Sequence, residues 1–247
     1  MKEILEGIHL NKIFRDGDSL VVAANDVSFT LHEGEFLGIV GESGCGKSTL
    51  LRLVSGLIKP DSGELTHDGE AYTGMSPAKT GRFLQMIFQD AYASFDPHMR
   101  MHRSILEAAP KNVSEEELVQ LLDDLHLEAK LLEKRPGELS GGQCQRMSIA
   151  RAILSGADIL LCDEITSALD VVTEAQIVSL LQGIRQKREF SMMFVSHNIA
   201  LVSQLCDRMI VMHDGQIVEA GTTKELLENP KQEYTKKLIA SSRMQSL

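Results

Sequence analysis

The 247-residue chain carries 43% hydrophobic and 24% charged residues, a balance that is ordinary for a folded globular protein and excludes a disordered one. Its formal net charge of −10 gives no support to nucleic-acid binding, because contact with phosphate backbones normally needs a basic face. We therefore expect no nucleic-acid partner, and either one large domain or two small ones.

Neither a secretory signal nor a membrane-spanning segment is predicted. The opening residues MKEILE lack the long apolar stretch of a signal peptide, and no apolar run approaches the roughly 18 residues of a transmembrane helix. Four cysteines, Cys45, Cys144, Cys162 and Cys206, form no C-x-x-C pair, so isolated reduced thiols are expected rather than a zinc or iron–sulfur site. The chain is expected to be cytosolic, or bound to a membrane only through partners.

The first part of the chain predicts strands that lead into a glycine-rich loop and a helix. Alternating apolar residues, turn signals and one continuous apolar run predict strands at 7–14, 21–31 and 36–40, a helix from about 47 to 57, and a short strand pair at 64–72. Pro60 and Gly63 follow the helix, and Asp68-Gly69 is a typical hairpin turn.

Residues 91–154 predict a mainly helical insert between two αβ parts. Ser114 followed by three glutamates indicates a helix start, and apolar positions then recur at helical spacing, at Leu118, Leu121, Leu122 and Leu125. A second helix is expected from near Gly141 to Leu154. Beyond the insert, short apolar runs predict buried strands at 159–162 and 192–195, a helix between them at 172–186, a hairpin at 208–219 and a helical tail at 223–240.

The stretch GESGCGKSTL, residues 41–50, directly follows the apolar run at 36–40 and fits the phosphate-binding pattern G-x-x-x-x-G-K-[ST]. Glycines allow the backbone to curl so that successive N–H groups point at phosphate oxygens, and the following helix adds its positive N-terminal end. Lys47 would reach the β and γ phosphates of a nucleoside triphosphate, and Ser48 would bind Mg²⁺. The alternative, a chance match in a glycine-rich turn, is disfavoured because a buried strand precedes the loop and a helix follows it.

Two adjacent carboxylates end the predicted strand at 159–162, in the sequence ILLCDE. At a strand end beside a phosphate loop, Asp163 would lie next to the Mg²⁺ and Glu164 near the γ-phosphate, where it could accept a proton from an attacking water. Alone, the pair could equally be a solvated turn; together with the phosphate loop the catalytic interpretation is favoured.

The motif LSGGQ, residues 139–143, opens the second predicted helix of the insert. A serine and two glycines at a helix start can form a second anion-binding cradle, although the pattern alone fits an ordinary N-cap as well. With LLCDE, SALD and FVSHN downstream, LSGGQ resembles the ATP-binding subunit of ABC transporters over nearly the whole chain. This resemblance implies a single α/β domain over 1–247, with a P-loop NTPase (RecA-like) core, an antiparallel β subdomain and an inserted helical subdomain, the core being 1–90 and 155–247 and the helical subdomain 91–154.

The resemblance also implies a role for each motif residue. Glu164 matches the catalytic base, His197 the switch that contacts the γ-phosphate, and Gln89 the glutamine that senses Mg²⁺ and the transport subunit. Asp170 matches a loop that communicates across a dimer, and Phe14 lies where the family stacks an aromatic ring on adenine. The implied nucleotide-binding set is Phe14, Gly41, Ser43, Gly44, Cys45, Gly46, Lys47, Ser48, Thr49, Ser140, Gly141, Gly142, Gln143 and Asp170, and the implied Mg²⁺ set is Ser48, Gln89 and Asp163.

In this family two chains enclose two ATP molecules head to tail, each site combining the phosphate loop of one chain with the LSGGQ motif of the other. The expected ligands are therefore ATP and Mg²⁺. The expected partners are a second ABC ATPase chain, identical or paralogous, integral membrane permease subunits and, indirectly, an extracellular solute-binding protein. The expected location is peripheral, at the cytoplasmic face of the cell membrane.

The stretch FQDAYASFDPHM and the tail GQIVEAGTTKELLENPKQEYTKKLI resemble the peptide and nickel importer group. The short tail is more similar to the nickel or metal-chelate branch than to longer peptide importers that carry a cysteine cluster. Nickel, a metal chelate and short peptides all remain possible solutes. The leading rival is an accessory ATPase of a soluble complex, such as the phosphonate carbon–phosphorus lyase machinery; DNA-repair members need coiled coils or zinc modules, which are not evident in this sequence.

Three positions depart from the family pattern: Ile165 replaces a common proline, and Cys45 and Cys144 lie in the phosphate loop and after LSGGQ. Either thiol could make the site oxidisable, but small residues tolerated at these positions are the favoured interpretation. His98 and His102 have the i, i+4 spacing of metal ligands, yet no third ligand is evident, so no metal site is predicted there.

Overall fold

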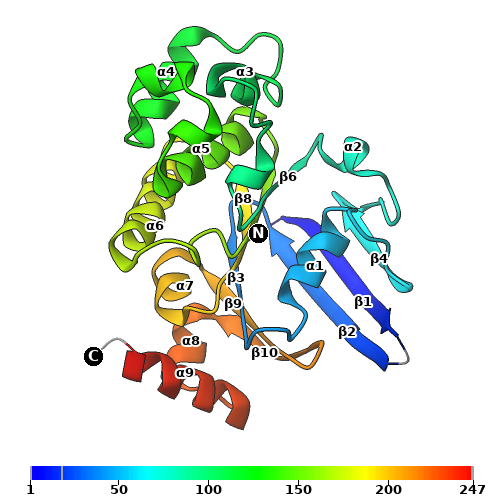
Figure 1. Cartoon of the computed structure of the whole chain (residues 1–247). Coiled ribbons are helices and arrows are strands. Elements are labelled where there is room, and N and C mark those ends of the chain that lie inside the picture. The colour runs from blue at the N-terminus through cyan, green and yellow to red at the C-terminus, as the bar shows by residue number, and fades with distance from the viewer. Residues whose placement is uncertain (1, 18, 246–247) are drawn as a thin grey trace. The chain divides into compact units, whose positions relative to one another are not determined.

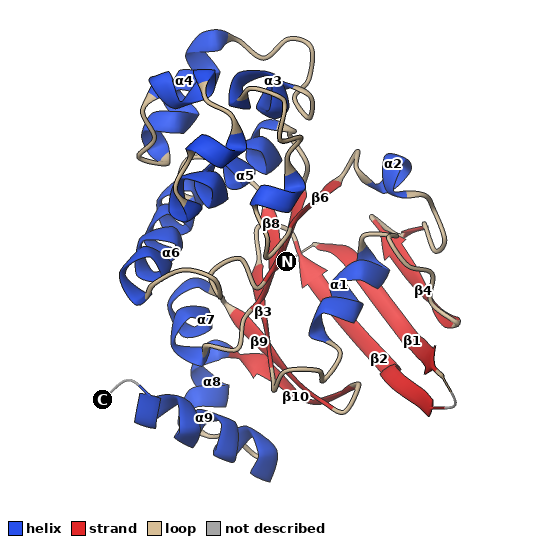
Figure 2. Ribbon diagram, viewed as in Figure 1, coloured by secondary structure: helices blue, strands red, loops and turns tan. Residues whose placement is uncertain are grey.

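The computed structural model describes residues 2–17 and 19–245 of the chain. They fold into two compact units, one formed by Met1–Arg82 with Ser191–Leu247 and the other by Phe83–Phe190. Each unit contains both helices and strands (Figures 1 and 2). The helical segment predicted at 91–154 lies within the second unit, and its exact bounds remain a prediction.

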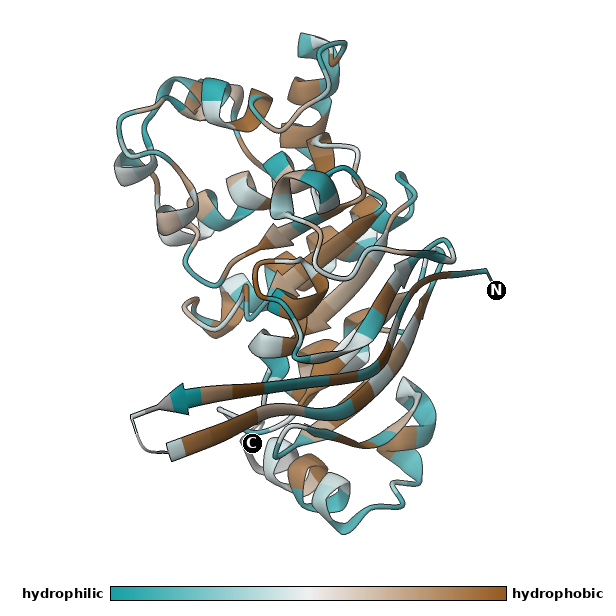
Figure 3. Ribbon diagram, turned by 90° about the vertical axis from the view of Figure 1, so that its right-hand side faces the viewer, coloured by the Kyte–Doolittle hydropathy of each residue, from teal (hydrophilic) through white to brown (hydrophobic). Residues whose placement is uncertain are grey.

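The first unit contains an antiparallel sheet with the strand order β2-β1-β4-β5. Its strands are β1 (Glu3–Asp16), β2 (Ser19–His32), β4 (Ser62–His67) and β5 (Glu70–Ala71). The predicted strands at 7–14 and 21–31 are confirmed, but both are longer, because pairing continues to the hairpin turn, where Asp16 lies opposite Ser19. Hydrophobic residues continue into the outer part of this hairpin, where Ile13, Leu20 and Val22 are exposed (Figure 3).

A second group of strands in the first unit has the order β10-β9-β3-β8. The strands β3 (Phe36–Val40), β8 (Ser191–Val195) and β9 (Arg208–His213) are parallel, and β10 (Gln216–Thr222) pairs antiparallel to β9. Every residue of β3 and β8 is buried, which explains their continuous apolar sequences. The phosphate loop follows the end of β3, and the segment with His197 follows the end of β8.

The helices of the first unit are α1 (Lys47–Val54), α2 (Pro77–Thr80), α7 (Ile199–Leu205), α8 (Thr223–Glu228) and α9 (Glu233–Gln245). The prediction for α1 was too long at its C-terminus, because Gly56 takes a left-handed φ of 75° and ends the helix. The single helical tail predicted at 223–240 is two helices, separated around Pro230, whose ring cannot continue a helix. The short helix α7 was not predicted.

The second unit contains a pair of parallel strands, β6 (Leu84–Ile87) and β7 (Ile159–Asp163). Its helices are α3 (Met101–Leu106), α4 (Glu115–Asp124), α5 (Gly141–Leu154) and α6 (Val171–Arg185), with 3-10 turns at Tyr92–Ser94, Ala129–Glu133 and Pro136–Glu138. The predicted start of α4 is confirmed, since the Ser114 hydroxyl accepts a hydrogen bond from the Glu117 N–H at 3.1 Å. Within the part of the chain that the structure describes, none of the helices is both long enough and apolar enough to cross a bilayer.

Candidate nucleotide-binding site

The phosphate loop connects the buried strand β3 to the N-terminus of α1 in the first unit. A Cβ atom added at Gly41 would lie 2.2 Å from the Met212 carbonyl oxygen, and one at Gly46 would lie 2.1 Å from the Ala23 carbonyl oxygen. Gly46 is the N-cap residue of α1, with φ 107°, and provides no side-chain cap for the first turn. The close backbone packing therefore requires glycine at both positions and leaves the helix N-terminus without a side chain above it, which suits an anion such as phosphate.

Lys47 is almost fully buried in the loop that it belongs to, with 3% of its surface exposed. Its Nζ donates hydrogen bonds to the carbonyl oxygens of Gly41, at 2.9 Å, and Glu42, at 2.8 Å. A buried ammonium group needs such partners because its desolvation is costly. The loop thus holds a positive charge inside its own curl, at the position where the sequence predicts contact with phosphates.

The backbone around the loop is held by the turn between β9 and β10. The Gly215 N–H donates to the Cys45 carbonyl oxygen at 3.0 Å, and the Gly215 carbonyl accepts from the Asn25 N–H at 2.8 Å. Ser43 and Gly44 are exposed, whereas Ser48 and Thr49 are half-buried in the first turn of α1. The exposed side of the loop is therefore the side from which a ligand can approach.

His197 lies at the same edge of the parallel strands as the phosphate loop. The strands β3 and β8 run parallel with Ile39 opposite Val195, so Gly41 and His197 each lie two residues beyond a paired position. The His197 side chain is exposed, and the Ser196 N–H donates to the Ile39 carbonyl at 3.2 Å, which fixes the start of this loop. The structure therefore brings these two sequence-predicted elements together.

Phe14 lies on β1 with 38% of its surface exposed, and the Lys12 ammonium lies 5.6 Å from the centre of its ring. It is paired with Val21, two residues before Ala23, whose carbonyl borders Gly46. The ring of Phe14 is exposed, and the neighbouring strand β2 borders the phosphate loop. Phe14 is therefore suitably placed to stack on a base.

In the second unit, Gln89, Asp163 and Glu164 follow the ends of two paired strands. Ile87 of β6 lies opposite Cys162 of β7, and because the strands are parallel their carboxyl ends share one edge. Asp163 is buried, Glu164 is half-buried and Gln89 is exposed. Glu164 has a left-handed φ of 48°, an uncommon conformation for a residue with a side chain and one that occurs preferentially at functional sites.

The LSGGQ motif forms a reciprocal capping box at the start of α5. The Ser140 hydroxyl accepts from the Gln143 N–H at 3.3 Å, and the Gln143 side-chain oxygen accepts from the Ser140 N–H at 3.0 Å. The ordinary N-cap function that the pattern also allowed is therefore present. Both polar side chains of the motif are engaged with their own helix.

Asp170 caps α6, and the capped residue Thr173 packs against Gly142 of the motif. Its carboxylate accepts from the Thr173 N–H at 3.0 Å and from the Thr173 hydroxyl at 2.7 Å, and these bonds lower the pKa of Asp170. A Cβ atom added at Gly142 would lie 3.0 Å from the Thr173 methyl group. Thr173 was missed by sequence reasoning, although its spacing of three residues from Asp170 is a recognisable capping signal.

A second residue that sequence reasoning missed is Tyr92, within the stretch FQDAYASFDP. Its hydroxyl donates to the carbonyl of Leu139, the residue before Ser140, at 2.8 Å. In the same stretch, Arg151 of α5 donates to the Ser94 carbonyl at 2.7 Å and its guanidinium lies 4.3 Å from the centre of the Phe95 ring. This segment is thus joined to both ends of the motif helix.

All four cysteines, Cys45, Cys144, Cys162 and Cys206, are free thiols and buried. Burial raises the pKa of Cys45, and it raises the pKa of Cys144 to about 11, so both thiols are protonated at neutral pH.

His102 lies 3.3 Å from a Glu115 carboxylate oxygen, and among the described residues no group of three or more histidine, cysteine or acidic side chains is gathered as a metal site.

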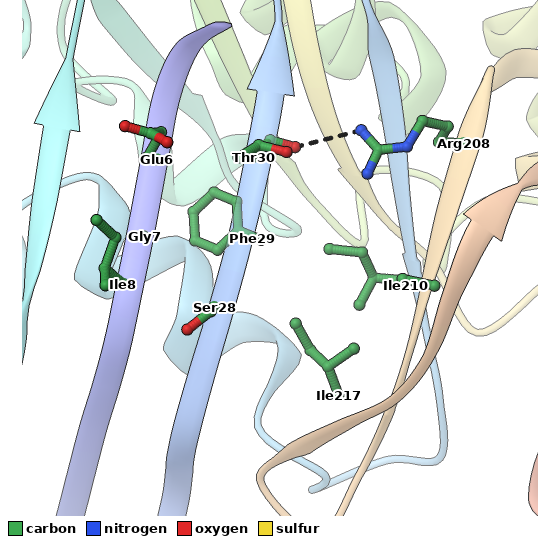
Figure 4. A pocket seen from close by; sticks show the side chains of 10 residues that line it. Glu6, Gly7, Ile8, Ser28, Phe29, Thr30, Arg208, Ile210 and Ile217 are labelled. Atoms are coloured by element: carbon green, nitrogen blue, oxygen red, sulfur yellow. Dashed lines mark hydrogen bonds between the residues drawn. The ribbon is translucent and has the colours of Figure 1, made fainter. Parts of the chain in front are cut away.

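A surface cavity of about 330 Å³ lies elsewhere in the first unit, between the strands β1 and β2 and the strands β9 and β10 (Figure 4). Apolar side chains form most of its wall, with the guanidinium of Arg208 at one end directed toward Thr30. It contains none of the motif residues. The phosphate loop, rather than this cavity, is therefore the candidate site.

Comparison with known proteins identifies the family. Residues 24–167 match the family model described as ABC transporter. The chain belongs to this family. The oligopeptide transport ATP-binding protein OppF of Escherichia coli (strain K12) is 40% identical over 230 residues, which cover 89% of this chain and 69% of that protein. The glutathione import ATP-binding protein GsiA of Pectobacterium atrosepticum is 38% identical over 241 residues, covering 94% of this chain and 38% of that protein.

Among solved structures, a dimeric post-hydrolysis state of the ATP-binding cassette MJ0796, bound to ADP and Pi, is similar with a TM-score of 0.78. It is 27% identical in sequence, and the match covers 89% of this chain and 99% of that one. The predicted fold class, an α/β P-loop ATPase of the ABC type, is confirmed. The chain is an ABC ATPase subunit that binds and hydrolyses ATP.

Proposed function

We propose that this ABC ATPase powers the uptake of short peptides through partner membrane subunits. The similarity to an oligopeptide transport ATP-binding protein, which extends over 89% of the chain, carries the proposal. Glutathione, named for the second relative, is itself a short peptide. Nickel, which the sequence analysis also left open as a solute, is retained as an outcome of the test rather than as the proposed solute.

Within the proposed reaction, the first unit holds the triphosphate. The N–H groups of the loop and the N-terminus of α1 bind the phosphate oxygens, and Lys47 exchanges carbonyl partners for the β and γ phosphates. His197, which leaves the same strand edge as the loop, contacts the γ-phosphate, and the exposed ring of Phe14 stacks on adenine.

The second unit provides the catalytic carboxylate. Glu164, held in a strained backbone conformation directly after a buried strand, orients the attacking water and accepts its proton. Asp163, one residue earlier and buried, would instead serve as a ligand of Mg²⁺. The two neighbouring acids thus have different functions.

Mg²⁺ fits the chemistry of the predicted donor set. The hydroxyl of Ser48, the carboxylate of Asp163 and the side-chain amide of Gln89 all offer oxygen, and Mg²⁺ commonly takes one or two carboxylates together with substrate phosphates and water. When bound, Mg²⁺ would neutralise charge that develops on the phosphates.

A second ABC ATPase chain, identical or paralogous, completes each site in this proposal. LSGGQ lies at the start of α5, where Ser140 and the helix N-terminus can meet the γ-phosphate held by the other chain. The segment around Tyr92, which is joined to both ends of α5, is the proposed contact with the permease, so that movement there reaches the motif. The chain would then lie peripherally at the cytoplasmic face of the membrane.

The importer proposal is tested in a strain that lacks this gene. Uptake of a labelled tripeptide should disappear, return with the wild-type gene, and stay absent with the Lys47→Ala variant. Selective loss of nickel uptake would replace the peptide with the metal as solute. Unchanged uptake of both, together with co-purification of phosphonate-degrading lyase subunits, would overturn the importer function.

The role of Glu164 is tested by Glu164→Gln, which removes the proton acceptor but keeps the shape of the side chain. Hydrolysis should slow by at least about 100-fold, a common contribution of a general base. ATP should still bind, so a dimer should accumulate in light scattering. The exposed Glu189→Gln is the control in the same unit; if it slows hydrolysis equally, or if Glu164→Gln remains monomeric in excess ATP, the assignment is wrong.

A further inference from the structure

A tyrosine near the C-terminus of the chain contacts the phosphate loop directly. Tyr234 is the second residue of α9, and its hydroxyl oxygen accepts a hydrogen bond from the N–H of Glu42 at 3.1 Å. The two residues lie 192 positions apart in the sequence but within one unit. No motif in the sequence indicates this contact.

The hydrogen bond completes the anchoring of a single peptide group. The peptide between Gly41 and Glu42 presents its N–H to Tyr234, while its carbonyl oxygen, which belongs to Gly41, accepts from Lys47 Nζ at 2.9 Å. Hydrogen bonds at both ends of one peptide group polarise it and strengthen each other. This peptide therefore contributes one of the two carbonyl contacts that position the Lys47 ammonium, the other being the Glu42 carbonyl oxygen at 2.8 Å.

The peptide has little other freedom. A Cβ atom at Gly41 would lie 2.2 Å from the Met212 carbonyl oxygen and 2.8 Å from the Cys45 sulfur, so one face of the residue is packed against β9 and the loop itself. Its Glu42 side, in contrast, is exposed. Tyr234 is the contact that fixes the peptide on this exposed side.

Tyr234 is itself held in place. Its ring stacks on His213, the last residue of β9, with ring centres 4.0 Å apart and planes inclined by 24°. The segment before α9 is anchored by Glu219 of β10, whose carboxylate accepts from the N–H groups of Lys231 at 2.8 Å and Gln232 at 3.1 Å. The phenol is thus supported by the same hairpin whose turn holds the other end of the phosphate loop.

We propose that Tyr234 is a positioning residue for ATP: its hydroxyl fixes the Gly41–Glu42 peptide in the orientation from which Lys47 meets the phosphates. The loop is then preorganised before the nucleotide arrives, and preorganisation raises affinity by reducing the ordering cost of binding. When Lys47 turns to the phosphates, the Tyr234 hydroxyl keeps the peptide in place. The C-terminal helix is, by this contact, part of the nucleotide site without touching the nucleotide.

The test compares Tyr234→Phe with the wild-type chain in binding of a fluorescent ATP analogue in the presence of Mg²⁺. Phenylalanine keeps the stack on His213 and removes only the hydroxyl, so the dissociation constant should rise about 3- to 10-fold, as expected for the loss of one neutral hydrogen bond. Tyr72→Phe is the matched control: Tyr72 lies in the same unit and its hydroxyl donates to the Val54 carbonyl at 3.0 Å, at the far end of α1. It should lower thermal stability and leave the dissociation constant unchanged.

Hydrogen exchange provides a second measurement. Its pattern distinguishes a tyrosine that positions the phosphate loop from one that only attaches α9. In the nucleotide-free chain the Glu42 amide should exchange slowly, and Tyr234→Phe should accelerate it while the amides of α9 stay protected. By reciprocity of coupling, ATP should increase protection of α9 in the wild type and should do so less in Tyr234→Phe.

Three results would overturn the proposal. An unchanged dissociation constant for Tyr234→Phe, with faster exchange throughout α9, would show that the tyrosine only attaches the helix. Tighter binding would show that it holds the loop in a competing conformation. An equal loss of affinity in Tyr72→Phe would show that general destabilisation, rather than the hydroxyl on Glu42, causes the effect.

Discussion

The helices α1 and α5 both begin at glycine-rich motifs, but the N–H groups of their first turns differ in their hydrogen-bond partners. The first N–H groups of any helix lack partners within it. At α5, Ser140 and Gln143 cap one another and so occupy the helix start with side chains of the same chain. At α1 the N-cap is Gly46, which has no side chain to offer. The start of α1 is therefore open to an external anion, whereas the start of α5 is already capped by its own residues.

The glycines themselves have different functions in the two motifs. Gly41 and Gly46 are required because neighbouring carbonyl groups approach them too closely for a Cβ atom. Gly142 instead packs against the Thr173 methyl group of α6, with 3.0 Å available to a Cβ atom, and Gly141 has more room. From this difference we expect the phosphate loop to bind phosphates within one chain, and LSGGQ to act only when a γ-phosphate from a second chain competes with the capping box.

The largest effect that tests this comparison is expected from Lys47→Ala. The variant removes the buried ammonium group. Loss of its charged hydrogen bond to the phosphates should weaken ATP binding about 10- to 100-fold. Titration with a fluorescent ATP analogue measures the loss. The exposed Lys59→Ala, in the same unit, should bind as the wild type does; if Lys47→Ala also binds normally, the loop does not hold the triphosphate.

A smaller and more selective effect is expected from Ser140→Ala. Loss of the cap should lower the free energy of unfolding by about 1 kcal/mol. Hydrolysis at saturating ATP should fall roughly tenfold, about the value of one hydrogen bond to a charged phosphate, because the contact across the dimer is lost. ATP binding by the monomer should not change, since the phosphate loop is intact.

Thr222→Ala is the matched control for this variant. Thr222 and Glu225 form the same reciprocal capping box at the start of α8, with the Thr222 hydroxyl accepting from the Glu225 N–H at 3.2 Å. The control should show the same loss of stability with normal hydrolysis. Equal loss of hydrolysis in both variants would reduce Ser140 to a simple helix cap.

The sequence predicted most of the fold where a local signal was strong. The strands β3, β7 and β8 were recognised because burial on both faces gives a continuous apolar run, and α4 and α5 because Ser114 and Ser140 are recognisable caps. The strand β6 was missed because only its end residues, Leu84 and Ile87, are buried, and the short helix α7 because seven residues give little periodicity.

The site was predictable to the extent that its residues lie in contiguous motifs. The supporting contacts were not, because they join distant parts of the chain: Tyr92 reaches Leu139, and Tyr234 reaches Glu42. A tyrosine hydroxyl has no pattern that names its partner, so only the fold reveals the contact. The pairing of Asp170 with Thr173 is local and could have been found from its spacing alone.

The smallest expected effect separates recognition of the base from recognition of the phosphates. Phe14→Ala should weaken ATP binding by a few-fold, because an exposed ring gains only part of the energy of aromatic stacking. Its neighbour Ile13 is similarly exposed, at 46%, and on an extended strand its side chain points to the opposite face, so Ile13→Ala should bind ATP as the wild type does. Inorganic triphosphate, which has no base, should bind equally to all three proteins, since the phosphate loop is unchanged. If Phe14→Ala weakens triphosphate and ATP alike, the ring supports the loop rather than the adenine, and the base is recognised by another residue.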